Sequence, residues 1–213
     1  MDAEVLKQRH RGLREDQPEA LRMRIHRAIS WLSRSEREQD DPDARFIFLW
    51  IAFNAAYASE FGFEKSEHDQ ANAFIEHVLA HDAQKHLHRA LFEQFTGPIR
   101  TLIENRYVFE PFWRALRNHE SGDAWKLSFE ASRKRAMHAL MNGETATLLS
   151  IVLTRLYVLR NQLIHGGATW NGQTNRAQVK DGVAILSTVV PIIIDLMLQA
   201  DPADFDEVAF PVV

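Results

Sequence analysis

The sequence predicts an all-α protein. Glycine and proline are scarce, at 9 and 7 among 213 residues, which argues against a turn-rich all-β fold. Apolar residues recur at helical spacing along several long stretches, and capping or helix-breaking residues separate these stretches. The length favours a single domain over residues 1–213, which is large enough to bury a core without disulfides. The absence of cysteine excludes disulfides, Cys-based zinc sites and a Cys nucleophile.

Two long helices are predicted near the N-terminus. The first begins near Pro18, because proline suits the first helical turn, and an apolar stripe follows over Leu21–Leu32. Asp41 is the predicted cap of the second helix, which runs over about 42–60 and contains a stretch that is apolar on all sides. Gly62 is a plausible stop for this helix.

Residues 64–143 are predicted to form a set of shorter helices inserted between the second and third core helices. Ser66 with Asp69 forms a capping-box-like start. Gly97-Pro98 is expected to break the helical pattern, and Asn142-Gly143 to end a helix. Several aromatic residues give this segment an apolar surface, so we expect it to pack on the main bundle.

Two further core helices follow the insert. The third spans about 144–165 and ends at Gly166-Gly167. After a short loop, Asn175 with Gln178 is predicted to open the fourth helix as another capping-box-like pair. That helix reaches about residue 199, and Pro191 within it is expected to cause a kink.

The four long helices, over about 18–60 and 144–200, predict a bundle with a crossover connection.

The net charge of −4 gives no global signal for binding to nucleic acid or a membrane. Residues 1–37 nevertheless carry nine basic and six acidic side chains. This basic end could meet phosphates, and a solvated helix face is the competing interpretation. The first fifteen or so residues are polar and are expected to be mobile.

No signal peptide is visible, and the most apolar stretch, 183–198, contains polar residues. This stretch falls short of the ~18 apolar residues that a membrane span requires. We therefore expect a cytoplasmic protein with no membrane association.

The segment with the clearest chemistry is the end of the third core helix. Asn161 and His165 are four residues apart and share a helix face. Arg160 precedes His165 by five residues, so a regular helix places these two side chains well apart around its axis. They converge only if the helix loosens near Gly166-Gly167 or if a second subunit contributes its own set.

This trio suits cleavage of an RNA phosphodiester. A histidine can take a proton from a 2′-hydroxyl or give one to the leaving 5′-oxygen. Arginine can bind the phosphate and stabilise charge in the transition state, while Asn161 can orient either partner. RNA supplies its own nucleophile, so no metal or cofactor is needed. The alternative is that Arg160 and His165 only interact with the helix C-terminus.

The string Arg160-Asn161-Gln-Leu-Ile-His165-Gly166 resembles the signature of the HEPN superfamily (higher eukaryotes and prokaryotes nucleotide-binding). That signature is an arginine, a polar residue directly after it and a histidine four to six residues on. The second core helix contains Trp50, then Phe53-Asn54 and Tyr57, which resembles the Apea-like branch of the family.

The resemblance implies a four-helix up-down bundle that forms a homodimer through its third and fourth core helices, with the two motifs facing each other in one cleft. Many members are metal-independent endoribonucleases of toxin–antitoxin, phage-defence or RNA-processing systems. Other members are non-catalytic and bind nucleotides or partner proteins. By resemblance, Arg160, Asn161 and His165 are the catalytic residues, RNA is the substrate and an antitoxin is a candidate partner. Asn54 is expected to line the same cleft, or else to bond within the core.

Two other features have a functional and a structural interpretation. Trp170, in the loop after the motif, could stack on a base or could cap the end of the bundle. His77 and His81, with His86 and His88 nearby, could bind a metal, but a third ligand is not evident. A polar helix face is the default interpretation, so no metal ligands are assigned.

Overall fold

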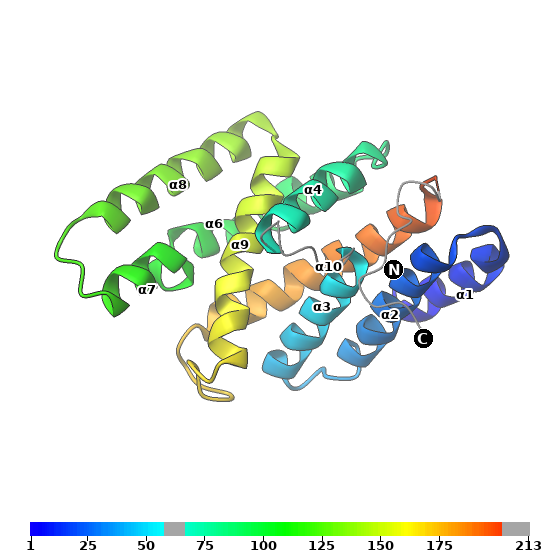
Figure 1. Ribbon diagram of the computed structural model, residues 1–213, viewed down its shortest axis with the longest axis horizontal. Coiled ribbons are helices and arrows are strands. Elements are labelled where there is room, and N and C mark those ends of the chain that lie inside the picture. The colour runs from blue at the N-terminus through cyan, green and yellow to red at the C-terminus, as the bar shows by residue number, and fades with distance from the viewer. Residues whose placement is uncertain (58–66, 202–213) are drawn as a thin grey trace. The chain divides into compact units, whose positions relative to one another are not determined.

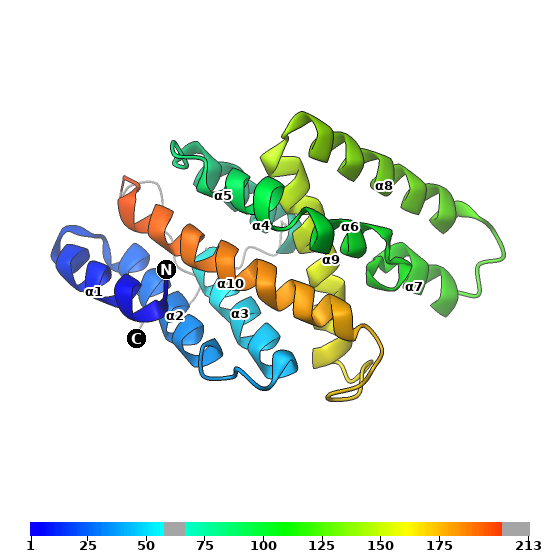
Figure 2. The ribbon, with the colours of Figure 1, turned by 180° about the vertical axis from the view of Figure 1, so that it is seen from behind.

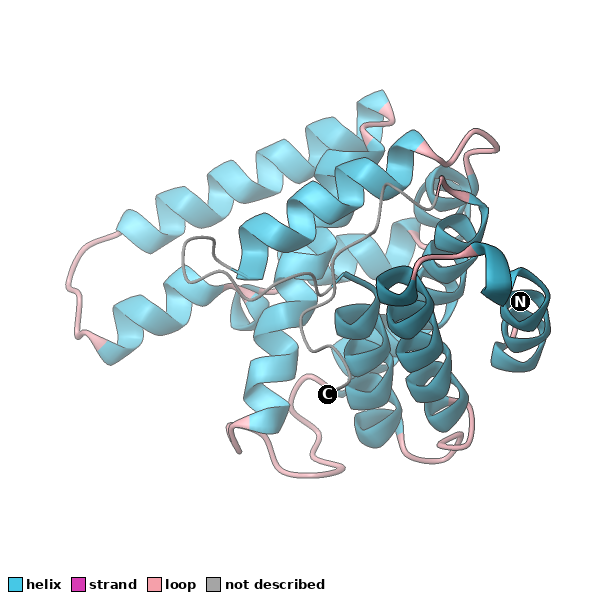
Figure 3. Cartoon of the chain, turned by 45° about the vertical axis from the view of Figure 1, so that its right-hand side comes forward, coloured by secondary structure: helices cyan, strands magenta, loops and turns pink. Residues whose placement is uncertain are grey.

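The computed structural model describes residues 1–57 and 67–201 of the chain. Within these ranges every regular element is a helix and no strand is present (Figure 3). The all-α prediction is confirmed. The described chain forms two compact units, unit 1 (residues 1–57, 67–87 and 183–201) and unit 2 (residues 88–182).

Unit 1 contains the N-terminal helices and most of the last helix. Its elements are α1 (Ala3–Leu13), the 3-10 turn η1 (Arg14–Asp16), α2 (Glu19–Ser35), α3 (Pro42–Tyr57), α4 (Glu67–Ala80), the start of α5 (His86–Arg89) and the larger part of α10 (Arg176–Gln199). Helices α2 and α3 lie side by side and antiparallel (Figure 1). The apolar side chains buried along them are Leu21, Ile25, Ala28, Ile29, Leu32, Phe46, Leu49, Trp50, Ala52, Phe53 and Ala56.

The ends of α3 have side-chain hydrogen bonds that explain its position. Asp41 Oδ1 accepts the backbone N–H groups of Asp43 and Ala44, each over 3.0 Å, which confirms the predicted cap. Arg24 is buried and donates from Nε and Nη2 to the carbonyl of Ala56 over 3.0 and 2.7 Å. This arginine therefore joins α2 to the last described turn of α3. The predictions for Gly62 and for Ser66 with Asp69 lie outside the residues whose side chains the structure describes.

The prediction that the first fifteen residues are mobile is wrong. They form α1, where Asp2 caps the helix by accepting the N–H of Val5 over 2.9 Å. Ala3, Leu6 and His10 are buried, and α1 packs on α2. This stripe has only three members in a mostly charged segment, so its helical spacing is easily overlooked.

Unit 2 contains most of the predicted insert and the helix that carries the motif. Its elements are the end of α5, the π-helix η2 (Ala90–Gln94), α6 (Thr96–Glu104), η3 (Arg106–Val108), α7 (Glu110–Arg117), α8 (Ala124–Asn142), α9 (Thr145–Ile164) and the first two turns of α10. Helix α8 ends at Gly143, whose φ of +68° is left-handed, as predicted for Asn142-Gly143. The predicted break at Gly97-Pro98 is wrong. Pro98 lies in the first turn of α6, where a missing N–H is tolerated, and the break falls one turn earlier at Phe95.

The four predicted core helices correspond to α2, α3, α9 and α10. Helices α2 and α3 belong to unit 1 and α9 to unit 2, while α10 runs without interruption from unit 2 into unit 1 (Figure 2). By length and composition, α10 is the one described helix that could cross a membrane. However, 67% of its most apolar 18-residue window is buried in the protein, as in a core helix.

Candidate functional site

The end of helix α9 positions the motif residues. The helix is regular through Ile164, and the N–H of His165 still bonds to the carbonyl of Asn161 over 3.0 Å. Gly166 then takes a φ of +70°, a left-handed conformation that favours glycine. The chain turns back so that the N–H of Ala168 bonds to the carbonyl of Gln162 over 3.0 Å. His165 is thus the exposed C-cap of α9, at the edge of this turn.

A pocket of about 690 Å³ opens beside this helix end, entirely within unit 2. Asn161 and His165 both line it, as their four-residue spacing predicts. The opposite wall comes from η3 and α7 and includes Tyr107 and Trp113. The loop after α9 and the residue before α10, Asn175, complete the lining.

Gln162 holds the walls of this pocket together. Its Nε2 donates to the carbonyl of Tyr107 over 2.6 Å, and its Oε1 accepts a hydrogen bond from Asn175 Nδ2 over 2.8 Å. Trp113 Nε1 donates to the same Tyr107 carbonyl over 2.8 Å. One glutamine therefore connects α9 to η3 and to the start of α10.

Helix α10 begins directly after Asn175, as predicted, but the Asn175 side chain is engaged elsewhere and does not cap it. Its side chain bonds to Gln162 and accepts from Asn105 over 3.5 Å. Its backbone φ of +59° also differs from the extended conformation of an N-cap residue.

Arg160 is connected to the pocket through Asn161. Its Nη1 donates to Asn161 Oδ1 over 2.9 Å, and its guanidinium lies 5.7 Å from the centre of the Tyr157 ring. Its Nε is buried and has no hydrogen-bond partner among the described residues. Within one chain, no described hydrogen bond or ion pair joins Arg160 to His165, in agreement with the separation that a regular helix imposes.

The other predicted ligand-binding residues lie outside this pocket lining. Trp170 is 72% exposed in the loop between α9 and α10. Asn54 is half-buried in α3 of unit 1, and its Oδ1 is buried without a hydrogen-bond partner among the described residues. Its position in the same cleft as His165 stays a prediction.

The histidines of the predicted cluster have structural contacts. His77 and His81 have ring centres 5.3 Å apart, and His88 Nδ1 lies 2.9 Å from Thr145 Oγ1. Asp82 caps α5 by accepting the N–H groups of His86 and Leu87, each over 2.8 Å. Among the residues that the structure describes, no three His, Asp or Glu side chains converge as a metal site would require.

Sequence reasoning missed the residues that build the opposite wall. Gln162 lies inside the motif, between Asn161 and His165, and this position could have indicated that it also faces the site. Tyr107 and Trp113 lie about fifty residues away along the chain, and no local pattern connects them to α9.

The chain matches no protein-family model, no curated protein and no solved structure.

Proposed function

We propose that the protein is a metal-independent endoribonuclease of the HEPN type that acts as a homodimer. The observation that supports this most is the pocket at the end of α9. Asn161 and His165, two of the three residues that the motif assigns to catalysis, line one cavity of about 690 Å³. The third, Arg160, is hydrogen-bonded to Asn161.

The proposed reaction is transfer of an RNA phosphodiester to its own ribose. One His165 takes the proton of the 2′-hydroxyl, and the 2′-oxygen forms a bond to phosphorus. The bond between phosphorus and the 5′-oxygen breaks, and that oxygen takes a proton from water. The products are a 2′,3′-cyclic phosphate and a 5′-hydroxyl. Arg160 stabilises the extra negative charge on the phosphoryl oxygens in the transition state.

The aromatic wall suits the binding of RNA bases. Tyr107 is 41% exposed, and its ring centre lies 6.3 Å from that of Trp113. Aromatic rings at a single-strand site stack on bases and favour unpaired RNA over a duplex. The pocket volume lies within the range of about 300–1,000 Å³ that is usual for small-molecule binding sites.

A homodimer explains how Arg160 and His165 could work together. In one chain they have no described contact, because five residues of helix separate them. In the proposed dimer, a two-fold axis brings the two motifs face to face. Arg160 of one subunit then acts with His165 of the partner subunit. A toxin or phage-defence setting, with an antitoxin as partner, belongs to the same proposal.

The second candidate is a binding module that cuts nothing. The observation in its favour is that the Arg160 guanidinium is already occupied by Asn161 and stacked near Tyr157, rather than pointing freely into the pocket. In that case the pocket binds a nucleotide, an RNA end or a partner protein and catalyses no reaction.

The two candidates are separated by an RNA cleavage assay with matched histidine variants. Purified protein is incubated with a mixture of single-stranded RNAs in excess EDTA, and the new ends are mapped. We expect cleavage with 2′,3′-cyclic phosphate ends, and a loss of about 10²-fold or more for His165→Gln. His119→Gln, a change at an exposed histidine outside the pocket, serves as the control and should cleave at the original rate. Intact RNA with the unmodified protein, together with measurable nucleotide binding, would select the binding module.

A further inference from the structure

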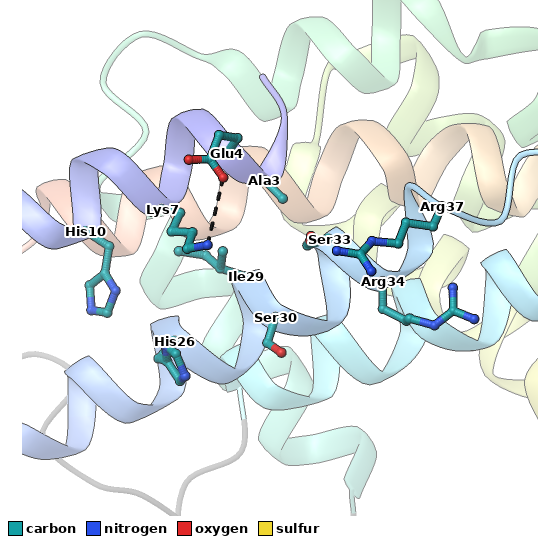
Figure 4. Close-up of a pocket in the computed structure, with 10 residues that line it drawn as sticks. All are labelled: Ala3, Glu4, Lys7, His10, His26, Ile29, Ser30, Ser33, Arg34 and Arg37. Carbon is teal, nitrogen blue, oxygen red and sulfur yellow. Dashed lines mark ion pairs between the residues drawn. The ribbon is translucent and has the colours of Figure 1, made fainter.

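The cleft between α1 and α2 in unit 1 does not gather its polar groups around one point (Figure 4). His10 and Arg37 lie at opposite ends of this cleft, whose volume is about 330 Å³. Lys7, which also lines it, forms an ion pair with Glu4 over 3.9 Å. The pocket beside α9 differs from this cleft, because a compact set of polar and aromatic groups on one helix, α7, lines it.

Glu110, Trp113 and Arg117 form one stripe along α7 in the wall of the pocket that His165 also lines. Their spacings of three and four residues place successive side chains on one helix face, with Cβ atoms about 5–6 Å apart. Arg117 Nη2 donates to Glu110 Oε1 over 2.6 Å, so the ion pair spans the turn that carries Trp113. A planar group that stacks on the indole therefore lies within reach of both the carboxylate and the guanidinium.

The indole of Trp113 is held in place by its neighbours. Its Nε1 donates to the carbonyl of Tyr107 over 2.8 Å, and the Phe112 ring meets it edge-on, with ring centres 5.1 Å apart. Phe112 in turn packs against Trp125 of α8, with ring centres 5.0 Å apart. A ring fixed in this way loses little conformational freedom when a ligand binds, which favours stacking of a nucleobase.

Glu110 keeps hydrogen-bonding capacity after it pairs with Arg117. An ionised carboxylate accepts at about four lone-pair sites, and the Arg117 bond uses one of them. Glu110 Oε2 has no hydrogen-bond partner among the described residues. The side chains of Arg117 and Glu110 are 61% and 51% exposed, so their ion pair contributes little to folding and can reorient towards a ligand.

We infer that this pocket selects guanine, with Glu110 accepting hydrogen bonds from N1–H and from the N2 amino group of the base. Guanine is the RNA base with two adjacent donors on its Watson–Crick edge, and a carboxylate accepts such a pair with its two oxygens. Adenine and cytosine each place an acceptor nitrogen beside the amino group, and uracil has one donor between two carbonyls. Arg117 donates to guanine O6, the remaining group on this edge.

The inference rests on the proposed function, since it concerns the same pocket, and it adds the base that the pocket selects. His165, which lines the pocket, acts on the 2′-hydroxyl of the nucleotide whose base is bound there. The RNA ends produced by cleavage are then guanosine 2′,3′-cyclic phosphates.

The inference is tested with three nucleotides that contain no bond to cleave. Calorimetry at pH 7.5 measures the affinities for guanosine, inosine and adenosine 3′-monophosphate. Inosine lacks the N2 amino group, and adenosine lacks both the N2 amino group and N1–H. We expect guanosine 3′-monophosphate to bind about tenfold more tightly than the inosine compound and about a hundredfold more tightly than the adenosine compound, because each hydrogen bond to a charged group contributes about tenfold.

A matched pair of variants assigns the selectivity to Glu110. E110Q keeps the size of the side chain but replaces one acceptor oxygen with a donor. It should bind guanosine 3′-monophosphate about tenfold more weakly than the unmodified protein and nearly as weakly as it binds the inosine compound. E130Q is the control, because Glu130 forms a comparable exposed ion pair with Arg133 on α8, outside the pocket, and its change alters the net charge equally. Thermal melting compares the folds of the two variants.

Equal affinities for the three nucleotides would overturn the inference, and so would E130Q weakening binding as much as E110Q. RNA cleavage with equal frequency after all four nucleotides would also overturn it, while leaving the proposed ribonuclease in place. Guanine-selective binding by a protein that leaves RNA intact would instead support the guanine pocket and contradict the proposed ribonuclease.

Discussion

Arg160 Nη1 and Asn161 Oδ1 are hydrogen-bonded over 2.9 Å at the end of α9. Asn161 lines the same pocket as His165, whereas Arg160 does not. Asn161 is therefore the side chain that connects the arginine of the motif to the pocket. This explains why a polar residue directly follows the arginine, a feature that helix-end capping alone does not require.

Replacing Asn161 with alanine should slow RNA cleavage while leaving RNA binding nearly unchanged. Arg160 loses the hydrogen bond that fixes its guanidinium, and a bond of this charged type contributes about tenfold in rate when it acts in the transition state. The measurement is kcat and KM for Asn161→Ala on a single RNA. A purely structural role would instead lower the melting temperature and leave kcat as it is.

Replacing Gln162 with alanine should loosen the pocket. Two hydrogen bonds are lost, to the Tyr107 carbonyl and from Asn175, and the free energy of unfolding should fall by about 1–2 kcal/mol. Urea denaturation measures this change. Gln173→Ala is the control, because Gln173 is exposed in the neighbouring loop, and it should stay within about 0.5 kcal/mol of the unmodified protein. Equal effects of the two changes would show that Gln162 does not hold the walls together.

Arg155 is a buried cation with no acidic partner among the described residues. It is 1% exposed, its guanidinium lies 4.3 and 5.3 Å from the Phe109 and Phe129 rings, and its described hydrogen bond is to Ser132 Oγ over 3.2 Å. Burial lowers the pKa of Arg155 to about 10.

Exchange of Arg155 for methionine removes this buried charge but keeps the apolar contacts with the two rings. The free energy of unfolding of Arg155→Met should therefore rise by about 1 kcal/mol, as for other buried charges replaced by apolar residues of similar volume. Chemical denaturation measures it, with the exposed Arg135→Met as the control. A loss of about 3 kcal/mol or more would instead indicate that Arg155 is paired with an anion.

The stability of unit 1 should depend on pH through His10. Burial, His26, Arg14 and Arg22 lower its pKa in the folded protein. The unfolded chain then binds the proton more readily, so the free energy of unfolding falls as the pH drops through the unfolded value of about 6.5. His10→Leu should show a shallower decrease between pH 7.5 and 5.5 than the unmodified protein. Identical slopes for the two proteins would contradict this assignment.

The sequence predicted the helices well where a local signal marks an end. Asp41 before Pro42 and Gly143 after Asn142 fix helix boundaries through hydrogen bonds and backbone conformation within a few residues. Helix α1 was not predicted from the sequence. Its apolar residues Ala3 and Leu6 are buried because α1 packs on α2, and a local pattern does not reveal that contact. The start of α10 at Asn175 was predicted correctly, but its side-chain cap was not, because the Asn175 oxygen accepts from Asn105 Nδ2, seventy residues away along the chain.

The candidate site was predictable only on the α9 side. The four-residue spacing of Asn161 and His165 places both on one helix face, and both line the pocket. The opposite wall depends on packing of η3 and α7 against α9, which no periodic pattern in the sequence encodes. Tyr107 and Trp113 could be found only once the chain was folded.

The most direct test of the proposed shared site is a complementation experiment with two inactive chains. Arg160→Gln and His165→Gln are purified separately, mixed in equal amounts, unfolded and refolded together, and assayed for RNA cleavage. If Arg160 of one subunit acts with His165 of the partner subunit, each single variant is inactive. The mixture then recovers about a quarter of the original rate, because half of the randomly formed dimers contain one intact site out of two. A mixture as inactive as the single variants, or a His165→Gln protein that cleaves RNA at the original rate, would contradict the account.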